Sequence, residues 1–249
     1  MPKGDNDIRV VYDGTKCGLN DAVWVPTFFL PTIQTHFRAV VQGTHMCDVD
    51  VGEMFLNFML HPKLQLFCGV DITPYDLDLS SLSFPQIKED GTKVWVSWDR
   101  IAMGLAWSPY QAVKTLHFAE EVIRGDPKDP ANVFRWDHVR LNLPGSPNYD
   151  PSLPWVSKVK VLKDGSVEVA TDLFKFVDDL RPTGASKAEC WRAGRRAASI
   201  LNWLGSQDAP GSDGIVTRIR VHGPDALFEL PMGFMSWLAM INGPRQSPR

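Results

Sequence analysis

The chain has 249 residues, 44% hydrophobic and 22% charged, a globular composition that suits one large domain or two small ones. Its net charge of −3 excludes a general positive field that would attract nucleic acids, although a local basic groove remains compatible with it. The most apolar stretches contain prolines or Glu229, and the N-terminus is polar. We therefore predict neither a membrane span nor a signal peptide, and expect an intracellular protein of the cytoplasm or the nucleus.

The cysteines are scattered and form neither a CxxC pair nor a cluster with histidine. A zinc site is therefore not expected, and free thiols in a reducing compartment are the default. The four are Cys17, Cys47, Cys68 and Cys190.

The N-terminal part of the chain is predicted to form short strands separated by loops. Apolar and β-branched residues indicate strands at 8–12, 64–72 and 93–103. The segment 35–41 is predicted to be a short helix, 44–61 a strand that runs into a turn and a helix, and 74–92 a polar loop.

The clearest helix pattern begins at Ser108, in "SPYQAVKTLHFAEEVIRG". Ser108 suits the N-cap, Pro109 the first helical position and Gln111 the third position of a capping box. One face is apolar, and Gly125 is expected to end the helix. The apolar positions are Ala112, Leu116, Ala119 and Ile123.

Residues 126–156 are rich in proline and asparagine and show little periodicity, so they are predicted to form an unusually long loop. The following segment predicts a hairpin that turns at Asp164-Gly165, then a strand "LFKFVDD".

A second helix is predicted from Ser186 to Leu204, with a capping box between Ser186 and Glu189. Its apolar stripe is Cys190, Ala193, Ala197, Ile200 and Leu204. Its cations lie mostly off that stripe and are interpreted as a solvated face rather than a nucleic-acid groove. They are Lys187, Arg192, Arg195 and Arg196.

Two adjacent acids, Asp178 and Asp179, follow the apolar strand. Neighbouring side chains point to opposite faces of a regular strand, so both acids can act together only if the chain turns directly after Val177. A hairpin tip would then present both carboxylates to a cation. The alternative is an ordinary pair of solvated turn residues.

A third acid, Asp50, lies at the end of another predicted strand in "CDVDVGEMF". Carboxylates from two neighbouring strands form the kind of oxygen cage that Mg²⁺ prefers. Two such ions, about 4 Å apart, would activate a 3′-hydroxyl and neutralise a triphosphate during phosphoryl transfer. Asp48 is a rival on the same strand face, but its residue five positions later is Glu53, whereas that of Asp50 is Phe55.

Four segments in this order resemble the palm and fingers of reverse transcriptases from retroviruses and long-terminal-repeat retrotransposons. "RVVYDGTKCGLND" is similar to the fingers segment, and "DVGEMF" to the Asp-x-x-x-x-aromatic motif. "MGLAWSPYQA" is similar to the Gly-x-x-x-Ser-Pro motif, and "FVDD" to the x-x-Asp-Asp motif with an aromatic first residue.

The resemblance implies a role for each matching residue. Asp50, Asp178 and Asp179 would be catalytic and would bind two Mg²⁺ ions. Phe55 would exclude the ribose 2′-hydroxyl, and Arg9 would contact the incoming triphosphate. Gly104, Ser108 and Pro109 would shape the pocket for nucleotide and template. The implied function is RNA-directed DNA polymerisation with an RNA template, a DNA or RNA primer and deoxynucleoside triphosphates.

The sequence also departs from the family. Met103 stands where many relatives have glutamine, little of the fingers precedes Arg9, and no thumb or ribonuclease H segment is recognised. We therefore expect a fragment or a degraded copy that is inactive alone. Two alternatives remain: an RNA-dependent RNA polymerase, which Phe55 disfavours, and a domesticated, non-catalytic nucleic-acid-binding protein.

The predicted fold is α+β: a polymerase palm whose antiparallel sheet carries the carboxylates and is backed by helices at 108–124 and 186–204. Residues 1–45 are predicted to be a partial fingers segment and 46–210 the palm, while 211–249 are unassigned.

Overall fold

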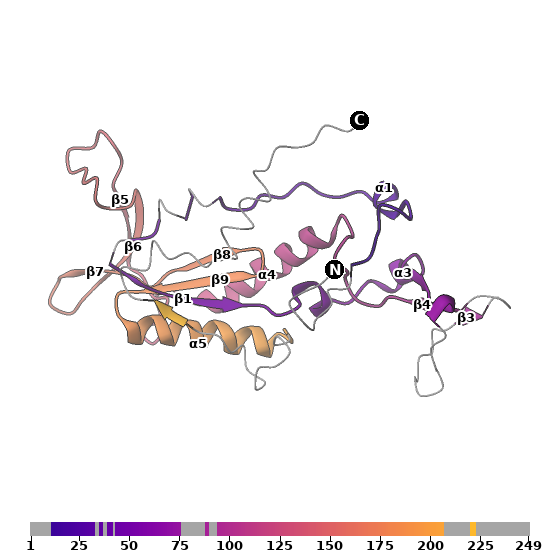
Figure 1. Ribbon diagram of the computed structural model, residues 1–249. Coiled ribbons are helices and arrows are strands. Elements are labelled where there is room, and N and C mark those ends of the chain that lie inside the picture. Colours follow the sequence, from indigo (N-terminus) through magenta and orange to yellow (C-terminus); the bar gives the residue numbers. More distant parts are fainter. Residues whose placement is uncertain are drawn as a thin grey trace. The chain divides into compact units, whose positions relative to one another are not determined.

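The computed structural model describes residues 11–32, 35–36, 39–41, 43–75, 88–89, 94–206 and 220–222. They form two compact units that alternate along the chain. The first takes its described residues from 11–30, 51–122 and 200–206, and the second from 31–50, 123–199 and 220–222. Helices and antiparallel sheets are both present (Figure 1), so the protein has a mixed α and β fold, as the sequence predicts at this level.

The first unit contains short elements and one long helix. In chain order they are α1 (Leu19–Ala22), the 3₁₀ helix η1 (Met54–Asn57), α3 (Pro62–Gln65), β2 (Gly69–Asp71), the 3₁₀ helix η2 (Thr73–Tyr75), β3 (Lys88–Glu89), β4 (Val94–Ser97) and α4 (Ser108–Arg124). Strands β2, β4 and β3 form an antiparallel sheet in that order. The strands predicted at 64–72 and 93–103 are therefore shorter than expected, and β3 lies within the predicted loop 74–92.

A buried cluster of Leu60, Cys68, Ala102 and Leu105 forms the core of the first unit. The chain near Tyr12 is tied to it, because the Tyr12 amide donates to the Met103 carbonyl at 2.8 Å. Residues 11 and 12 are not in a strand, and the rest of the strand predicted at 8–12 lies outside the described residues.

Helix α4 confirms the strongest helix prediction. Its predicted apolar face is buried, and Gly125 follows it with a left-handed φ of 59°. The predicted capping box is wrong, because Ser108 is already helical and its hydroxyl donates to the Ala102 carbonyl at 2.9 Å. The end of the helix belongs to the second unit, where Arg124 bonds to Asp172.

The second unit is built on a four-stranded antiparallel sheet with the strand order β10-β1-β9-β8. The strands are β10 (Arg220–His222), β1 (His45–Asp50), β9 (Asp179–Gly184) and β8 (Leu173–Phe176). Strand β10 lies in the segment 211–249 that the sequence left unassigned; the rest of that segment lies outside the described residues.

Helix α5 (Lys187–Trp203) lies along the sheet of the second unit (Figure 1). Small side chains on the helix allow a close approach: Cys190, Ala193 and Ala197 are fully buried. The Cys47 thiol of β1 donates to the Cys190 carbonyl at 3.4 Å. A Cβ at Gly184 of β9 would lie 2.7 Å from the Cys190 amide nitrogen, so glycine is required there.

The start of α5 bears out only half of the predicted capping box. The Ser186 hydroxyl accepts from the Glu189 amide at 3.2 Å, but the Glu189 carboxylate bonds to Lys160 instead of to the Ser186 amide. The predicted apolar stripe is correct only at first. Leu201 is buried instead of the expected Leu204, which is 37% exposed, and Ile200 is half-buried.

A three-stranded antiparallel sheet completes the second unit, with the order β5-β6-β7. Strands β6 (Val156–Val161) and β7 (Val167–Val169) form the predicted hairpin around Gly165, which has a φ of 80°. The segment 126–156 is not the featureless loop that the sequence predicts. It contains β5 (His138–Leu141), which pairs with β6 through its backbone.

None of the described helices is both long and apolar enough to cross a membrane. All four cysteines have free thiols, and only Cys17 is exposed.

Candidate carboxylate site

The acidic pair lies at a two-residue hairpin turn in the second unit. Strands β8 and β9 pair up to Phe176 and Asp179, so Val177 and Asp178 form the turn between them. The chain therefore turns directly after the apolar strand, which is the geometry that allows two neighbouring acids to lie at one hairpin tip.

The register of β1 and β9 places Asp50 directly opposite Asp179. Side chains that face each other across an antiparallel pair lie on the same face of the sheet, with their Cβ atoms about 4.5–5.5 Å apart. Two carboxylates from segments far apart in the sequence thus meet at the end of β1. Asp178 in the adjoining turn is the third acid.

The two faces of this sheet differ in character. Val49 and Leu180, the neighbouring cross-strand pair, are 1% exposed. Because side chains alternate along a strand, Asp50 and Asp179 lie on the face opposite to that pair. The apolar face anchors the sheet, and the other face presents the carboxylates.

Asp48 also lies on the carboxylate face, but it is engaged in an ion pair. The Arg181 Nε atom lies 2.9 Å from Asp48 Oδ1, and both side chains are largely withdrawn from solvent. Arg181 thus engages Asp48, and the register places Asp50 rather than Asp48 directly opposite Asp179.

Asp179 has the most strongly raised pKa among the carboxylic acids for which a shift is resolved. Burial, followed by the charges of Asp178 and Asp50, raises the pKa of its carboxyl from 3.8 to about 7, while Arg181 acts in the opposite direction. Burial disfavours the charged form, and neighbouring negative charges do the same. The carboxyl of Asp179 is therefore about half protonated at neutral pH, and a bound cation would favour its charged form.

We expect this shift to make the stability of the metal-free protein depend on pH. The pKa of Asp179 is about 7 in the folded state and 3.8 ordinarily, so the folded state binds the extra proton between these values. The free energy of unfolding should therefore fall as pH rises from about 4 to about 7, by on the order of 3 kcal/mol from this group. Urea unfolding in EDTA at a series of pH values measures the effect.

Asp179→Asn provides the matched comparison, since it cannot titrate. Relative to Asp179→Asn, the free energy of unfolding of the unchanged protein should fall as pH rises from about 4 to about 7. Parallel profiles across the pH range would show that Asp179 has an ordinary pKa.

The turn residue Val177 adopts an unusual backbone conformation. Its φ is 50°, in the left-handed region that β-branched residues rarely enter. Such a conformation costs on the order of 1–3 kcal/mol and is often found at functional sites, where surrounding structure maintains it. Here it forms part of the turn that places Asp178 at the hairpin tip, next to the paired residues Asp179 and Asp50.

We expect Val177→Gly to be more stable than Val177→Ala, by about 0.5–1 kcal/mol, because glycine accepts positive φ without steric cost. Midpoints of urea unfolding compare the two variants. The same pair of changes at the exposed strand residue Val167 serves as a control and should give the opposite order. If alanine is the more stable residue at both positions, the turn is unstrained.

The carboxylates suit a divalent metal in their chemistry, because Mg²⁺ prefers hard oxygen ligands. Asp50, Asp178 and Asp179 supply such atoms from two strands and one turn, and the charges of Asp178 and Asp50 add to the effect of burial in raising the pKa of Asp179. Within the described part of the chain, however, no group of three or more aspartate, glutamate, histidine or cysteine side chains is arranged to hold a metal ion.

The other predicted site residues belong to the first unit or are not described. Phe55 lies in η1 and is half-buried. Ser108 is 1% exposed, and Pro109 occupies the first turn of α4. Arg9 lies outside the described residues.

Gly104 has a clear structural reason to be glycine. Its φ is 102°, and a Cβ there would lie 2.0 Å from the Tyr12 carbonyl oxygen. Asn20, from the "GLND" part of the fingers-like segment, donates to the Gly104 carbonyl at 2.9 Å and accepts from the Ala106 amide at 2.8 Å. Two of the resembling segments are thus joined in one local structure.

Two features of the carboxylate site were missed in the sequence: Arg181, which engages Asp48, and the left-handed backbone of Val177 within the turn that the sequence does predict. Once β9 is known to be a strand, the two-residue spacing of Asp179 and Arg181 places both on one face, which would have indicated Arg181. Nothing in the sequence signals the second.

Neither the family models nor the curated proteins compared with this chain give a match. The functional assignment therefore depends on the residues and their geometry.

Proposed function

We propose that this chain carries the catalytic palm of an RNA-directed DNA polymerase, similar to the reverse transcriptases of retroviruses and long-terminal-repeat retrotransposons. The observation that carries the proposal is the direct pairing of Asp50 with Asp179 across β1 and β9, with Asp178 in the adjoining turn. These three acids are the ones that the sequence motifs single out.

In this proposal Asp50, Asp178 and Asp179 hold two Mg²⁺ ions. When bound, such ions lower the pKa of an attacking 3′-hydroxyl and neutralise the charge of a triphosphate. The residues of the chain supply the cage: Asp50 and Asp179 lie on one face of the sheet, and Val177 sets the turn that carries Asp178. Because the pKa of Asp179 is near 7, metal binding should release a proton and should strengthen as pH rises.

The substrates follow from the same assignment. An RNA template, a DNA or RNA primer and a deoxynucleoside triphosphate would meet at the carboxylates. Phe55 would select the sugar, a role that suits a ring which is only half-buried. Gly104 and Pro109 would shape the pocket. Ser108 would contribute indirectly, by holding the start of α4 in place, because its hydroxyl is buried and donates to the Ala102 carbonyl.

The test is extension of a labelled primer on an RNA template with Mg²⁺, comparing deoxynucleotides with ribonucleotides. It is performed on this chain and on a longer form with complete fingers and thumb segments. We expect the longer form to add deoxynucleotides. Equal use of ribonucleotides would indicate an RNA polymerase instead, and no extension by the longer form would contradict the proposal.

A further inference from the structure

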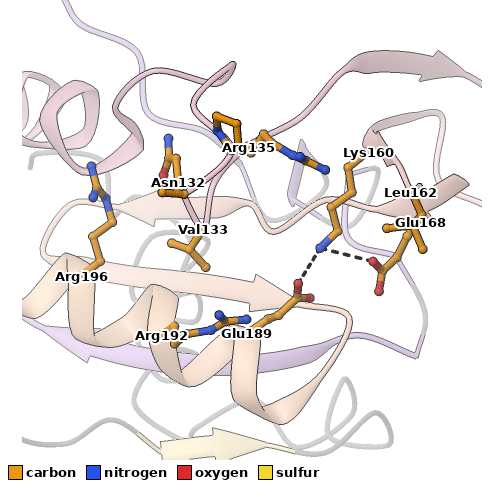
Figure 2. Close-up of a pocket in the computed structure, with 11 residues that line it drawn as sticks. Asn132, Val133, Arg135, Lys160, Leu162, Glu168, Glu189, Arg192 and Arg196 are labelled. Carbon is orange, nitrogen blue, oxygen red and sulfur yellow. Dashed lines mark hydrogen bonds and ion pairs between the residues drawn. The ribbon is translucent and has the colours of Figure 1, made fainter.

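A second charged site lies in the same unit, in a cavity of about 500 Å³ that we call the Lys160 cavity (Figure 2). Its walls are the loop before β5, the hairpin of β6 and β7, and one face of α5. The lining residues are Pro130, Ala131, Asn132, Val133, Arg135, Lys160, Leu162, Glu168, Glu189, Arg192 and Arg196.

The lining includes four cationic side chains and two carboxylates, a local positive excess in a chain whose net charge is −3. The carboxylates are both committed to Lys160, which is 9% exposed. Its Nζ atom lies 2.5 Å from Glu189 Oε1 and 3.3 Å from Glu168 Oε2, as the dashed lines in Figure 2 mark. Lys160 balances only one of the two carboxylates, so the positive excess of the lining comes from the three arginines and is smaller than their summed charge.

All three arginines line the cavity, and they differ in the partners that they have within the protein. Arg192 and Arg196 are four residues apart on α5, where like charges destabilise a helix unless something compensates them. Arg196 is held in place, because its Nε donates to the Ile123 carbonyl at 2.7 Å. In the part of the chain described, the side chains of Arg135 and Arg192 make no hydrogen bond or ion pair.

One acceptor atom in the cavity, Glu189 Oε2, indicates more closely which class of ligand would fit. Glu189 Oε2 is buried and has no hydrogen-bond partner among the described residues. A buried acceptor left without a donor is costly. A ligand that combines an anionic group for the arginines with a hydroxyl donor for Glu189 would satisfy both requirements. A phosphate group next to a sugar hydroxyl has this combination, and guanidinium groups match the geometry of phosphate oxygens.

We propose that the Lys160 cavity binds the phosphate of a nucleotide unit, either within a nucleic-acid strand or as a free nucleotide. The site is distinct from the carboxylate cluster, and the inference goes beyond polymerase activity and does not require it. It also assigns a role to Arg192 and Arg196, which the sequence alone interprets as part of a solvated face.

The test uses the whole chain in EDTA, so that no metal can hold a triphosphate at the carboxylates. Fluorescence anisotropy follows a labelled oligouridylate, in which each unit has a 2′-hydroxyl that can donate to Glu189, over a series of salt concentrations, and calorimetry follows free dTTP. The variant is Arg135→Gln with Arg192→Gln, and each change is also measured alone. Arg195→Gln is the matched control, because it removes the same charge from an exposed position of α5 that does not line the cavity.

We expect the double variant to bind one of the two probes about tenfold or more weakly, while Arg195→Gln binds like the unchanged protein. If the probe is the oligonucleotide, the salt dependence should also become less steep, by about 0.7 in the logarithmic slope for each arginine removed. The probe that responds identifies the source of the phosphate. Equal affinities in the double variant and in Arg195→Gln, or no binding of either probe by the unchanged protein, would overturn the proposal.

Discussion

Replacing Asp50 or Asp178 by asparagine should abolish DNA synthesis by an active form of this chain and leave its fold intact. Each change removes a charged metal ligand while keeping the size of the side chain. We expect the extension rate to fall by about a thousandfold or more, equivalent to about 4 kcal/mol of transition-state stabilisation. Asp50 is exposed at the end of β1, opposite the acid Asp179, and asparagine has the same size, so we expect Asp50→Asn to keep the fold.

Asp48→Asn is the informative comparison for this experiment. Asp48 lies on the same strand and the same face, but Arg181 already engages it. We expect this variant to lose some stability and to keep most of its extension activity. Near-normal extension by Asp50→Asn, or loss of synthesis in Asp48→Asn alone, would show that the wrong acid has been assigned. Unfolding of Asp50→Asn would show that this acid has a structural role.

Phe55→Val should admit ribonucleotides. If Phe55 has the role that we propose, its ring would lie beneath the sugar of the incoming nucleotide, and a 2′-hydroxyl would collide with it. A close-packed pocket cannot relax cheaply around such a collision. A clash of about 3 kcal/mol corresponds to roughly a hundredfold discrimination, which the smaller side chain should remove. The measurement is the ratio of kcat/KM for a deoxynucleotide to that for its ribonucleotide.

Phe55→Tyr keeps the ring in place and is therefore the control, with an expected ratio close to that of the unchanged protein. If Phe55→Val stays active and its ratio does not change, Phe55 serves only in packing. That result would remove the main argument for a DNA polymerase over an RNA polymerase.

The parts of the fold that could be predicted from sequence are those with strong local signals. Helix α4 was predicted from its apolar periodicity and from Gly125, and the β6–β7 hairpin from Asp164-Gly165. The N-cap of α5 was predicted because Ser186 and Glu189 stand at the spacing that places hydroxyl and amide together. Each of these signals depends only on residues close in sequence.

Strand β5 was missed because it lacks a buried face. The sequence of β5, "HVRL", does alternate polar and apolar residues, but it does so over only four residues. Its apolar residues are also exposed, Val139 by 45% and Leu141 by 64%, so the pattern marks no core-facing side. Its existence depends on backbone hydrogen bonds with β6, which leave no trace in its own sequence.

Strand β9 was not predicted from the sequence, for a different reason. Pro182 lies within it, although proline cannot donate to a neighbouring strand and is rare inside sheets. The Cys190 thiol of α5 donates to the Pro182 carbonyl at 3.6 Å, so a contact with the helix satisfies this carbonyl, although it does not replace the missing amide donor. Contacts of this kind join distant segments and cannot be inferred from a local pattern.

For the candidate site, the sequence identified the acids but not how they pair. It anticipated a turn after Val177, yet the position of Asp179 opposite Asp50 depends on the long-range register of β1 and β9. The same register separates Asp48 from Asp50 by giving Asp48 an arginine partner. Residue types thus indicated the chemistry, and strand pairing decides which acids share a face.

The central claim, that Asp50, Asp178 and Asp179 form a site for two divalent ions, is tested most directly by Mn²⁺ binding. Electron paramagnetic resonance can count bound Mn²⁺ on this chain in the presence of dTTP, without a primer or a template. We predict two bound ions close enough to be magnetically coupled, and loss of the coupling in Asp50→Asn and in Asp179→Asn. Asp164→Asn, at the tip of the other hairpin, should bind like the unchanged protein. Binding that is unaffected by Asp50→Asn and Asp179→Asn would contradict the claim.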